Sequence, residues 1–78
     1  MSNPLFSVSC MVYNVREVIR ILEKDGWYLV RQRGSHRQYR HSTKPGLVTV
    51  SGHKMNDDVP VCLLRSIESQ AGIKFPRR

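Results

Sequence analysis

The chain has 78 residues, enough for one small domain, and a domain of that size buries only about 60% of its unfolded surface. Its 40% hydrophobic content excludes wholesale disorder, while its size excludes a deep substrate cavity and confines any chemistry to a surface or a shallow groove. Thirteen Lys and Arg against six Asp and Glu leave a net charge of +7, which favours a polyanionic partner such as nucleic acid.

The first segment, residues 1–13, shows no regular hydrophobic period, and we expect a poorly ordered N-terminal extension. It has no charged leading region and Pro4 interrupts it, so the sequence predicts neither a signal peptide nor a membrane span. Cys10 and Cys62 lack the spacing of a metal site or a disulfide framework. We therefore expect reduced thiols in a cytoplasmic protein with no membrane association, and Cys62 in the core.

A first helix is predicted over roughly Val15–Asp25. Asn14 suits the N-cap position, and Glu17 three residues later completes a capping box. Gly26 is expected to end the helix at the position that favours a left-handed backbone. The apolar residues recur at the spacing of one buried helix face, namely Val15, Val18, Ile19 and Leu22.

Three strands are predicted next. The first is "WYLVRQR" at 27–33, the second is "HRQYRH" at 36–41, and the third is "LVTV" at 47–50. Gly34-Ser35 forms the first turn, and "STKPG" forms the loop of the second hairpin. Trp27, Tyr28 and Tyr39 are expected in the core, because aromatic residues at such positions usually pack inside.

A second helix is predicted to start near Pro60 and to end at Gly72, with Leu63, Leu64, Ile67 and Ala71 as its buried stripe. Residues 74–78 are expected to form a short basic tail. The order is therefore α-β-β-β-α. It predicts an α+β domain with a three-stranded antiparallel sheet, both helices on one face, and the other face open.

The most unusual stretch is "RGSHRQYRH" at 33–41, which lies in a region without any acidic residue from Gly26 to Asn56. Strand alternation places His36, Gln38 and Arg40 on one face, with Arg37, Tyr39 and His41 on the other. If Tyr39 faces the helices, His36 points to the open face. An edge bulge near Gly34 would change that assignment.

A histidine among arginines suits RNA cleavage, because RNA carries its own nucleophile in the 2′-hydroxyl. The imidazole can accept or donate a proton near neutral pH, and arginines stabilise charge on the phosphoryl group. Gly34 lets backbone N–H groups approach a phosphate closely. Two simpler interpretations remain open, a solvated basic strand and a passive nucleic-acid grip.

Other kinds of site are not supported by the residue pattern. Three histidines and two cysteines lack ligand spacing, so we expect no metal site and no cofactor. There is no phosphate-cradling Gly-rich loop and no Ser/His/Asp set. His41 and His53 are expected to be surface residues.

The residues also carry a family resemblance. The combination of Asp25-Gly26-Trp27, Gly34-Ser35-His36, Tyr39 and Lys44-Pro45-Gly46 resembles the HicA toxins, from about Asn14 to Ile73. This resemblance implies a HicA-like toxin domain over 14–73 with a double-stranded-RNA-binding-domain-like fold. It implies a ribosome-independent mRNA interferase without a metal cofactor, in which His36 is the catalytic residue.

The resemblance also implies partners. These are an mRNA substrate and a HicB-like antitoxin that covers the active site, so that operator DNA is reached only indirectly through the antitoxin. The expected substrate-binding residues are the motif glycine and serine together with nearby basic residues, namely Arg33, Gly34, Ser35, Arg37, Arg40 and Lys44. A toxin endoribonuclease is the leading hypothesis. The alternatives are a non-catalytic RNA-binding module of the same fold and a basic subunit that docks an acidic protein.

Overall fold

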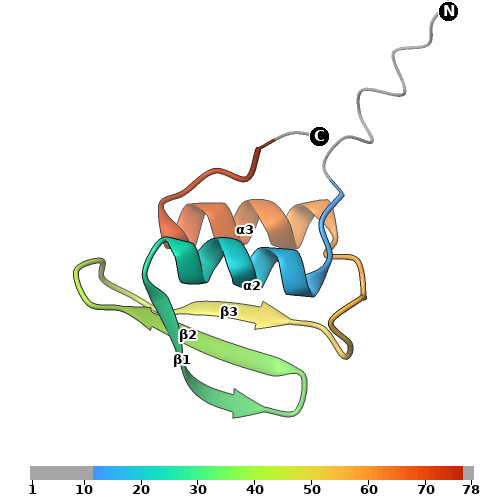
Figure 1. Ribbon diagram of the computed structural model, residues 1–78, viewed down its shortest axis with the longest axis horizontal. Coiled ribbons are helices and arrows are strands. Elements are labelled where there is room, and N and C mark those ends of the chain that lie inside the picture. The colour runs from blue at the N-terminus through green and yellow to red at the C-terminus, as the bar shows by residue number, and fades with distance from the viewer. Residues whose placement is uncertain (1–11, 77–78) are drawn as a thin grey trace, which may run out of the picture.

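The computed structural model describes residues 12–76 and confirms the predicted order of elements (Figure 1). Helix α2 spans Val15–Lys24, strands β1, β2 and β3 span Trp27–Arg33, His36–His41 and Val48–Ser51, and helix α3 spans Val61–Ala71. Residues 1–11, for which we expect a poorly ordered extension, and residues 77–78 at the end of the basic tail lie outside the described residues.

Helix α2 begins where the capping box predicts. The Asn14 side chain accepts a hydrogen bond from the Glu17 backbone N–H at 2.8 Å, and the Glu17 carboxylate accepts one from the Asn14 backbone N–H at 3.0 Å. These two bonds satisfy N–H groups that the first helical turn leaves without intrahelical partners. The predicted apolar face is buried as expected, with Val15, Val18, Ile19 and Leu22 all 9% exposed or less.

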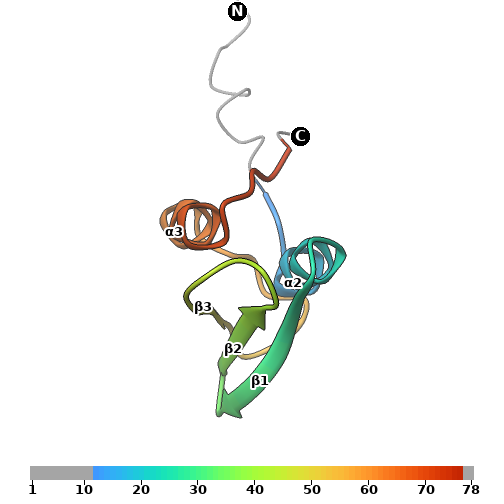
Figure 2. The ribbon, with the colours of Figure 1, turned by 90° about the vertical axis from the view of Figure 1, so that its left-hand side faces the viewer.

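The three strands form an antiparallel meander in the order β1-β2-β3. Both helices lie on one face of this sheet, as the end-on view in Figure 2 shows, and the opposite face is left open. The inward residues of β2 and β3 alternate with outward ones: Arg37, Tyr39, Val48 and Val50 are buried. The predicted two faces of β2 are therefore confirmed.

Helix α3 follows Pro60, which takes the N-cap position, and it ends at Gly72, whose backbone is left-handed with φ of 67°. Leu64, Ile67 and Ala71 are buried against the sheet. Cys62 is exposed on the first turn, so its predicted place in the core is wrong. The buried stripe begins at Leu64, one turn into the helix, and Cys62 precedes it on the solvent side.

The folded domain extends slightly beyond the predicted boundaries of 14–73. Tyr13 and Phe75 are 1% and 3% exposed, and their rings pack together with centroids 5.4 Å apart. The Tyr13 hydroxyl donates to the Pro76 carbonyl, and the Tyr13 carbonyl accepts from the Val59 N–H. Tyr13 therefore belongs to the core rather than to an extension, and Phe75 belongs to the core rather than to a solvated tail.

Gly26 joins α2 to β1 in a place that admits no side chain. Its φ is +104°, and a Cβ atom there would lie 2.7 Å from Nε2 of His41. We predict that Gly26→Ala lowers the free energy of unfolding by about 1–3 kcal/mol more than Gly46→Ala. Gly46 is the matched control, because its φ is +89° but nothing lies within 4 Å of its Cβ position. Urea unfolding of both variants measures the difference, and equal losses would contradict this reading of the contact.

Candidate functional site

A β-bulge in β1 decides which side chains reach the open face. Trp27 and Leu29 are in register with His41 and Tyr39 on the helix-facing side, and the register then shifts between Leu29 and Arg31. Strict alternation would carry Arg31 to the helix side as well. The extra residue, Val30, reverses the alternation, so that Arg31 and Arg33 point to the open face.

The register beyond the bulge forms two rows of side chains across the sheet. One row runs from Arg31 through Gln38 to Thr49, and the other runs from Arg33 through His36 to Ser51. Side chains directly opposite each other in an antiparallel pair have Cβ atoms about 4.5–5.5 Å apart. The bulge therefore brings two guanidinium groups beside one imidazole.

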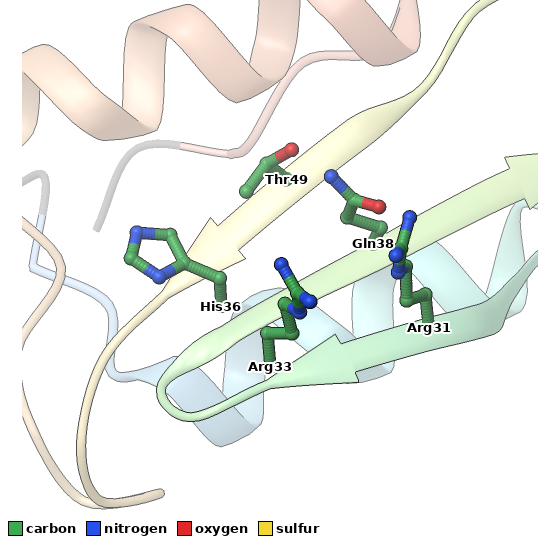
Figure 3. A pocket seen from close by; sticks show the side chains of 5 residues that line it. All are labelled: Arg31, Arg33, His36, Gln38 and Thr49. Carbon is green, nitrogen blue, oxygen red and sulfur yellow. The ribbon is translucent and has the colours of Figure 1, made fainter.

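Five of the six residues in these rows line a surface pocket of about 260 Å³. Figure 3 shows its five lining side chains projecting from the same side of the sheet, namely Arg31 and Arg33 from β1, His36 and Gln38 from β2, and Thr49 from β3. Both arginines and His36 are exposed to solvent. The pocket thus offers a proton-transferring group, two fixed positive charges and two neutral hydrogen-bonding groups to an anionic ligand.

The predicted site residues fall into two groups. Arg33 lines the pocket with His36, and Gly34 and Ser35 form the turn between them, where Gly34 has a φ of +56°. Arg40 is exposed on the same face but lies outside the pocket lining. Arg31 and Thr49 line the pocket although the sequence did not single them out. The bulge that places Arg31 has no clear mark in the sequence, because Val30 is typical of a regular strand.

Arg37 does not share the pocket. It is buried on the helix-facing side at 8% exposure, and its guanidinium donates to the Gly52 carbonyl at 3.1 Å. The Gly52 N–H in turn donates to the Ser35 carbonyl at 3.1 Å. Arg37 therefore helps to hold the loop after β3 against the turn that precedes His36, and its expected contact with substrate is not supported by its position.

Lys44 is also engaged elsewhere. It follows His41, the last residue of β2, whereas His36 is the first. At about 3.3 Å per residue the two ends of this strand are roughly 16 Å apart. Its ammonium donates to the Asp25 carboxylate at 2.6 Å and to the Ala71 carbonyl at 3.2 Å. The Trp27 indole N–H donates to the same carboxylate at 3.1 Å. This cluster joins the ends of α2 and α3 to the loop after β2.

The same contacts lower the pKa of the Asp25 carboxyl from its ordinary value. The hydrogen bond from Lys44 is the largest cause, and the charge of Lys44 and the hydrogen bond from Trp27 act in the same direction, whereas burial opposes them. Because the folded pKa lies below the unfolded one, the stabilisation is present above the unfolded pKa and is lost as the pH falls through the folded pKa.

We predict that Asp25→Asn lowers the free energy of unfolding at pH 7 by about 1 kcal/mol, since the ion pair is partly exposed to solvent. The difference between wild type and variant should shrink below about pH 4, where the unfolded carboxyl becomes protonated. Thermal unfolding of both proteins at pH 7 and at pH 3 measures this. A difference that stays constant across that range would show that the carboxylate charge contributes nothing.

His41 is a structural residue rather than the surface residue that the sequence predicted. Its Nδ1 accepts from the backbone N–H groups of Thr43 and Lys44 at 3.1 and 3.2 Å. With Nδ1 acting as acceptor, Nε2 carries the proton and donates to the Asp25 carbonyl at 2.6 Å. The ring also packs edge-on against Trp27, with centroids 5.1 Å apart. His41 therefore fixes the 42–46 loop.

Of the remaining aromatic and histidine residues, three lie where the sequence predicted and one does not. Trp27 and Tyr39 are each 2% exposed and lie in the core as predicted, whereas Tyr28 is 50% exposed, so its predicted burial is wrong. Burial raises the pKa of the Tyr39 hydroxyl, with Glu23 acting in the same direction and Arg37 opposing it. A neutral phenol on the helix side cannot serve as a base at the open face. His53 is exposed in the loop after β3, as predicted.

Within residues 12–76, no three His, Cys, Asp or Glu side chains are grouped as metal ligands would be. The helices of that part of the chain are also too short and too polar to cross a bilayer. The side chains that line the pocket are His36, Arg31 and Arg33 together with the neutral Gln38 and Thr49.

A three-stranded antiparallel sheet with both helices on one face and a cationic, histidine-bearing pocket on the other defines a small α+β domain of the double-stranded-RNA-binding-domain-like class. Residues 15–73 match the family model described as the HicA toxin of bacterial toxin-antitoxin systems. The match covers most of the chain, and the chain belongs to the HicA toxin family. It is thus the toxin of a toxin–antitoxin system, with an antitoxin as its partner. A search of curated proteins found no match.

Proposed function

We propose that this toxin is an endoribonuclease that cleaves single-stranded mRNA at the pocket on the open face. The observation that carries the proposal is the juxtaposition of His36 with Arg33 in one cross-strand pair and with Arg31 one row away. RNA supplies its own nucleophile, so one proton-transferring group and fixed positive charge suffice for cleavage. An open surface pocket also suits a flexible strand, whose nucleotides can rotate into line for attack.

In the proposed reaction, the 2′-hydroxyl oxygen forms a bond to phosphorus and the bond from phosphorus to the 5′-oxygen breaks. His36 acts either as the general base that takes the 2′-hydroxyl proton or as the general acid that protonates the leaving 5′-oxygen, and solvent water exchanges the other proton. Arg31 and Arg33 stabilise the negative charge that accumulates on the non-bridging oxygens. The products are a 2′,3′-cyclic phosphate and a 5′-hydroxyl end. The arginines supply the required charge, so the reaction as proposed needs no metal ion.

We also propose which partner the toxin has and where it acts. The antitoxin would be a HicB-like protein that covers the pocket, and the toxin would reach operator DNA only through it. The site of action would be the cytoplasm, where mRNA is available. Among the predicted substrate-binding residues, Arg33, Gly34, Ser35 and Arg40 keep that role in the proposal, because they lie in the pocket, in its turn or on its face.

The test is digestion of a long single-stranded RNA by purified toxin in EDTA, followed by analysis of the product ends. We expect cleavage with 2′,3′-cyclic phosphate ends. Products with intact 3′-hydroxyl ends would contradict the mechanism. Binding of the RNA without any cleavage would favour the second candidate, a non-catalytic RNA-binding module, because the cationic pocket supports binding in either case.

A further inference from the structure

Three consecutive apolar side chains are exposed on β1. Tyr28, Leu29 and Val30 have exposed fractions of 50%, 47% and 46%, and we refer to them as the β1 strip. Other large apolar residues that are exposed within residues 12–76 are single residues in the sequence, at Val12, Leu47, Met55 and Val61. Single exposed apolar residues are ordinary, but a contiguous group marks an interaction surface.

The strip lies on an open edge of the sheet. Within the described chain the sheet ends at β1, so the outer backbone groups of this strand have no neighbouring strand. The other edge strand is partly covered, because the Gln70 side chain from α3 accepts a hydrogen bond from the Thr49 N–H at 3.4 Å. An uncovered apolar edge strand is a place where another chain can bind.

The side chains of the β1 strip point to both sides of the sheet at this edge. Tyr28 is in register with Arg40 on the open face, whereas Leu29 is in register with Tyr39 on the helix-facing side. Val30 occupies the bulge between them and Arg31. A partner that covers the strip must therefore lie along the edge and contact both sides of the sheet, as an extended segment does.

Charge identifies the chemistry of the partner. The strip continues along β1 into Arg31 and Arg33 of the pocket, and the whole sheet from Trp27 to Ser51 contains no acidic residue. A second copy of this chain, itself carrying a net charge of +7, would join two sheets rich in arginine with no carboxylate between them. A segment that combines apolar and acidic side chains complements both parts of the strand.

We infer that an extended, acidic segment of the antitoxin binds along the outer edge of β1. Its apolar side chains cover Tyr28, Leu29 and Val30, and its carboxylates pair with Arg31 and Arg33 at the mouth of the pocket. RNA is a poorer occupant, because two of the three side chains, Leu29 and Val30, are aliphatic and only Tyr28 gives a base a ring to stack on. The inference rests on the antitoxin partner of the family and does not depend on RNA cleavage.

The experiment compares two double variants in the His36→Ala background, which permits production of the toxin. The first is Tyr28→Ser/Leu29→Ser, which removes two residues of the strip and leaves Val30 and its bulge in place. The control is Leu47→Ser/Val61→Ser, which removes two apolar residues of similar exposure elsewhere (39% and 44%). Titration calorimetry with the purified antitoxin encoded with the toxin gives the affinities, and thermal unfolding confirms that each variant folds.

We expect the strip variant to bind the antitoxin about tenfold or more weakly, and the control to bind as the parent does. We also expect the two serine substitutions of the strip, placed in the wild-type background, to leave cleavage of a long RNA unchanged. Unchanged antitoxin affinity would overturn the inference. Loss of RNA binding with antitoxin affinity retained would assign the strip to RNA. Loss of a toxin dimer in sedimentation with antitoxin affinity retained would assign it to a second copy, and either result would overturn the inference.

Discussion

His36→Ala is expected to reduce RNA cleavage by about 10²–10⁴-fold, the usual contribution of a positioned acid or base. RNA binding should change little, because Arg31 and Arg33 keep their places in the pocket and supply its positive charge. Since His36 is exposed, the substitution removes no core packing, and the free energy of unfolding should stay within about 0.5 kcal/mol of wild type. Single-turnover cleavage and a parallel gel-shift titration measure the two effects separately.

The matched control is His53→Ala, which removes an exposed imidazole from the loop after β3. That variant should cleave as wild type does. His41→Ala is unsuitable as a control, because it removes the hydrogen bonds that hold the 42–46 loop. Equal losses from His36→Ala and His53→Ala, or no loss from either, would remove His36 from the chemistry.

Arg31→Gln is expected to slow cleavage about 10²-fold, and Arg33→Gln about as much, if each guanidinium stabilises charge that develops on the phosphoryl group. The effect on the rate at saturating RNA should exceed the effect on binding, because the charge on the phosphoryl oxygens grows in the transition state. The cleavage rates of both variants at saturating RNA, compared with wild type, measure this.

Two comparisons make this prediction specific. Arg20→Gln removes the same charge from the outer surface of α2, on the far side of the sheet, and should leave the rate unchanged apart from a small effect on binding. Arg40→Gln removes a charge from the open face but outside the pocket lining, and should have an intermediate effect on binding only. A loss for Arg20→Gln as large as for Arg31→Gln would show that only the net charge matters.

Much of the fold follows from local signals in the sequence. The capping box at Asn14 and the left-handed Gly72 mark helix ends where the structure has them, and β1 and β2 have the predicted bounds. These features depend on residues close together in the chain, so the sequence shows them directly. The third strand is shifted by one residue, to Val48–Ser51, because hydrogen bonding to β2 and not its apolar run defines its ends.

The candidate site is harder to predict from the sequence, because part of it depends on strand pairing and on contacts between distant residues. Alternation places His36 and Arg37 on opposite faces of β2, and the burial of Tyr39 decides that the face of His36 is the open one. The place of Arg31 depends on a bulge at Val30, and the role of Lys44 depends on an ion pair with Asp25 across the fold. The bulge is a property of how β1 pairs with β2, and the ion pair joins residues 19 apart in the chain, so neither is marked by a local pattern. The same contacts explain why motif residues around Gly26 and Lys44 serve the structure rather than the pocket.

The most direct test of the central claim compares an RNA with its 2′-O-methylated counterpart in EDTA, using wild-type toxin and His36→Ala side by side. We expect wild-type toxin to cut only the unmodified RNA, His36→Ala to cut that RNA about 10²–10⁴-fold more slowly and the modified RNA not at all, and both proteins to bind both RNAs. Cleavage of the 2′-O-methylated strand at the same rate would contradict it, because the proposed nucleophile is then blocked. Equal cleavage of the unmodified RNA by the two proteins would contradict it as well.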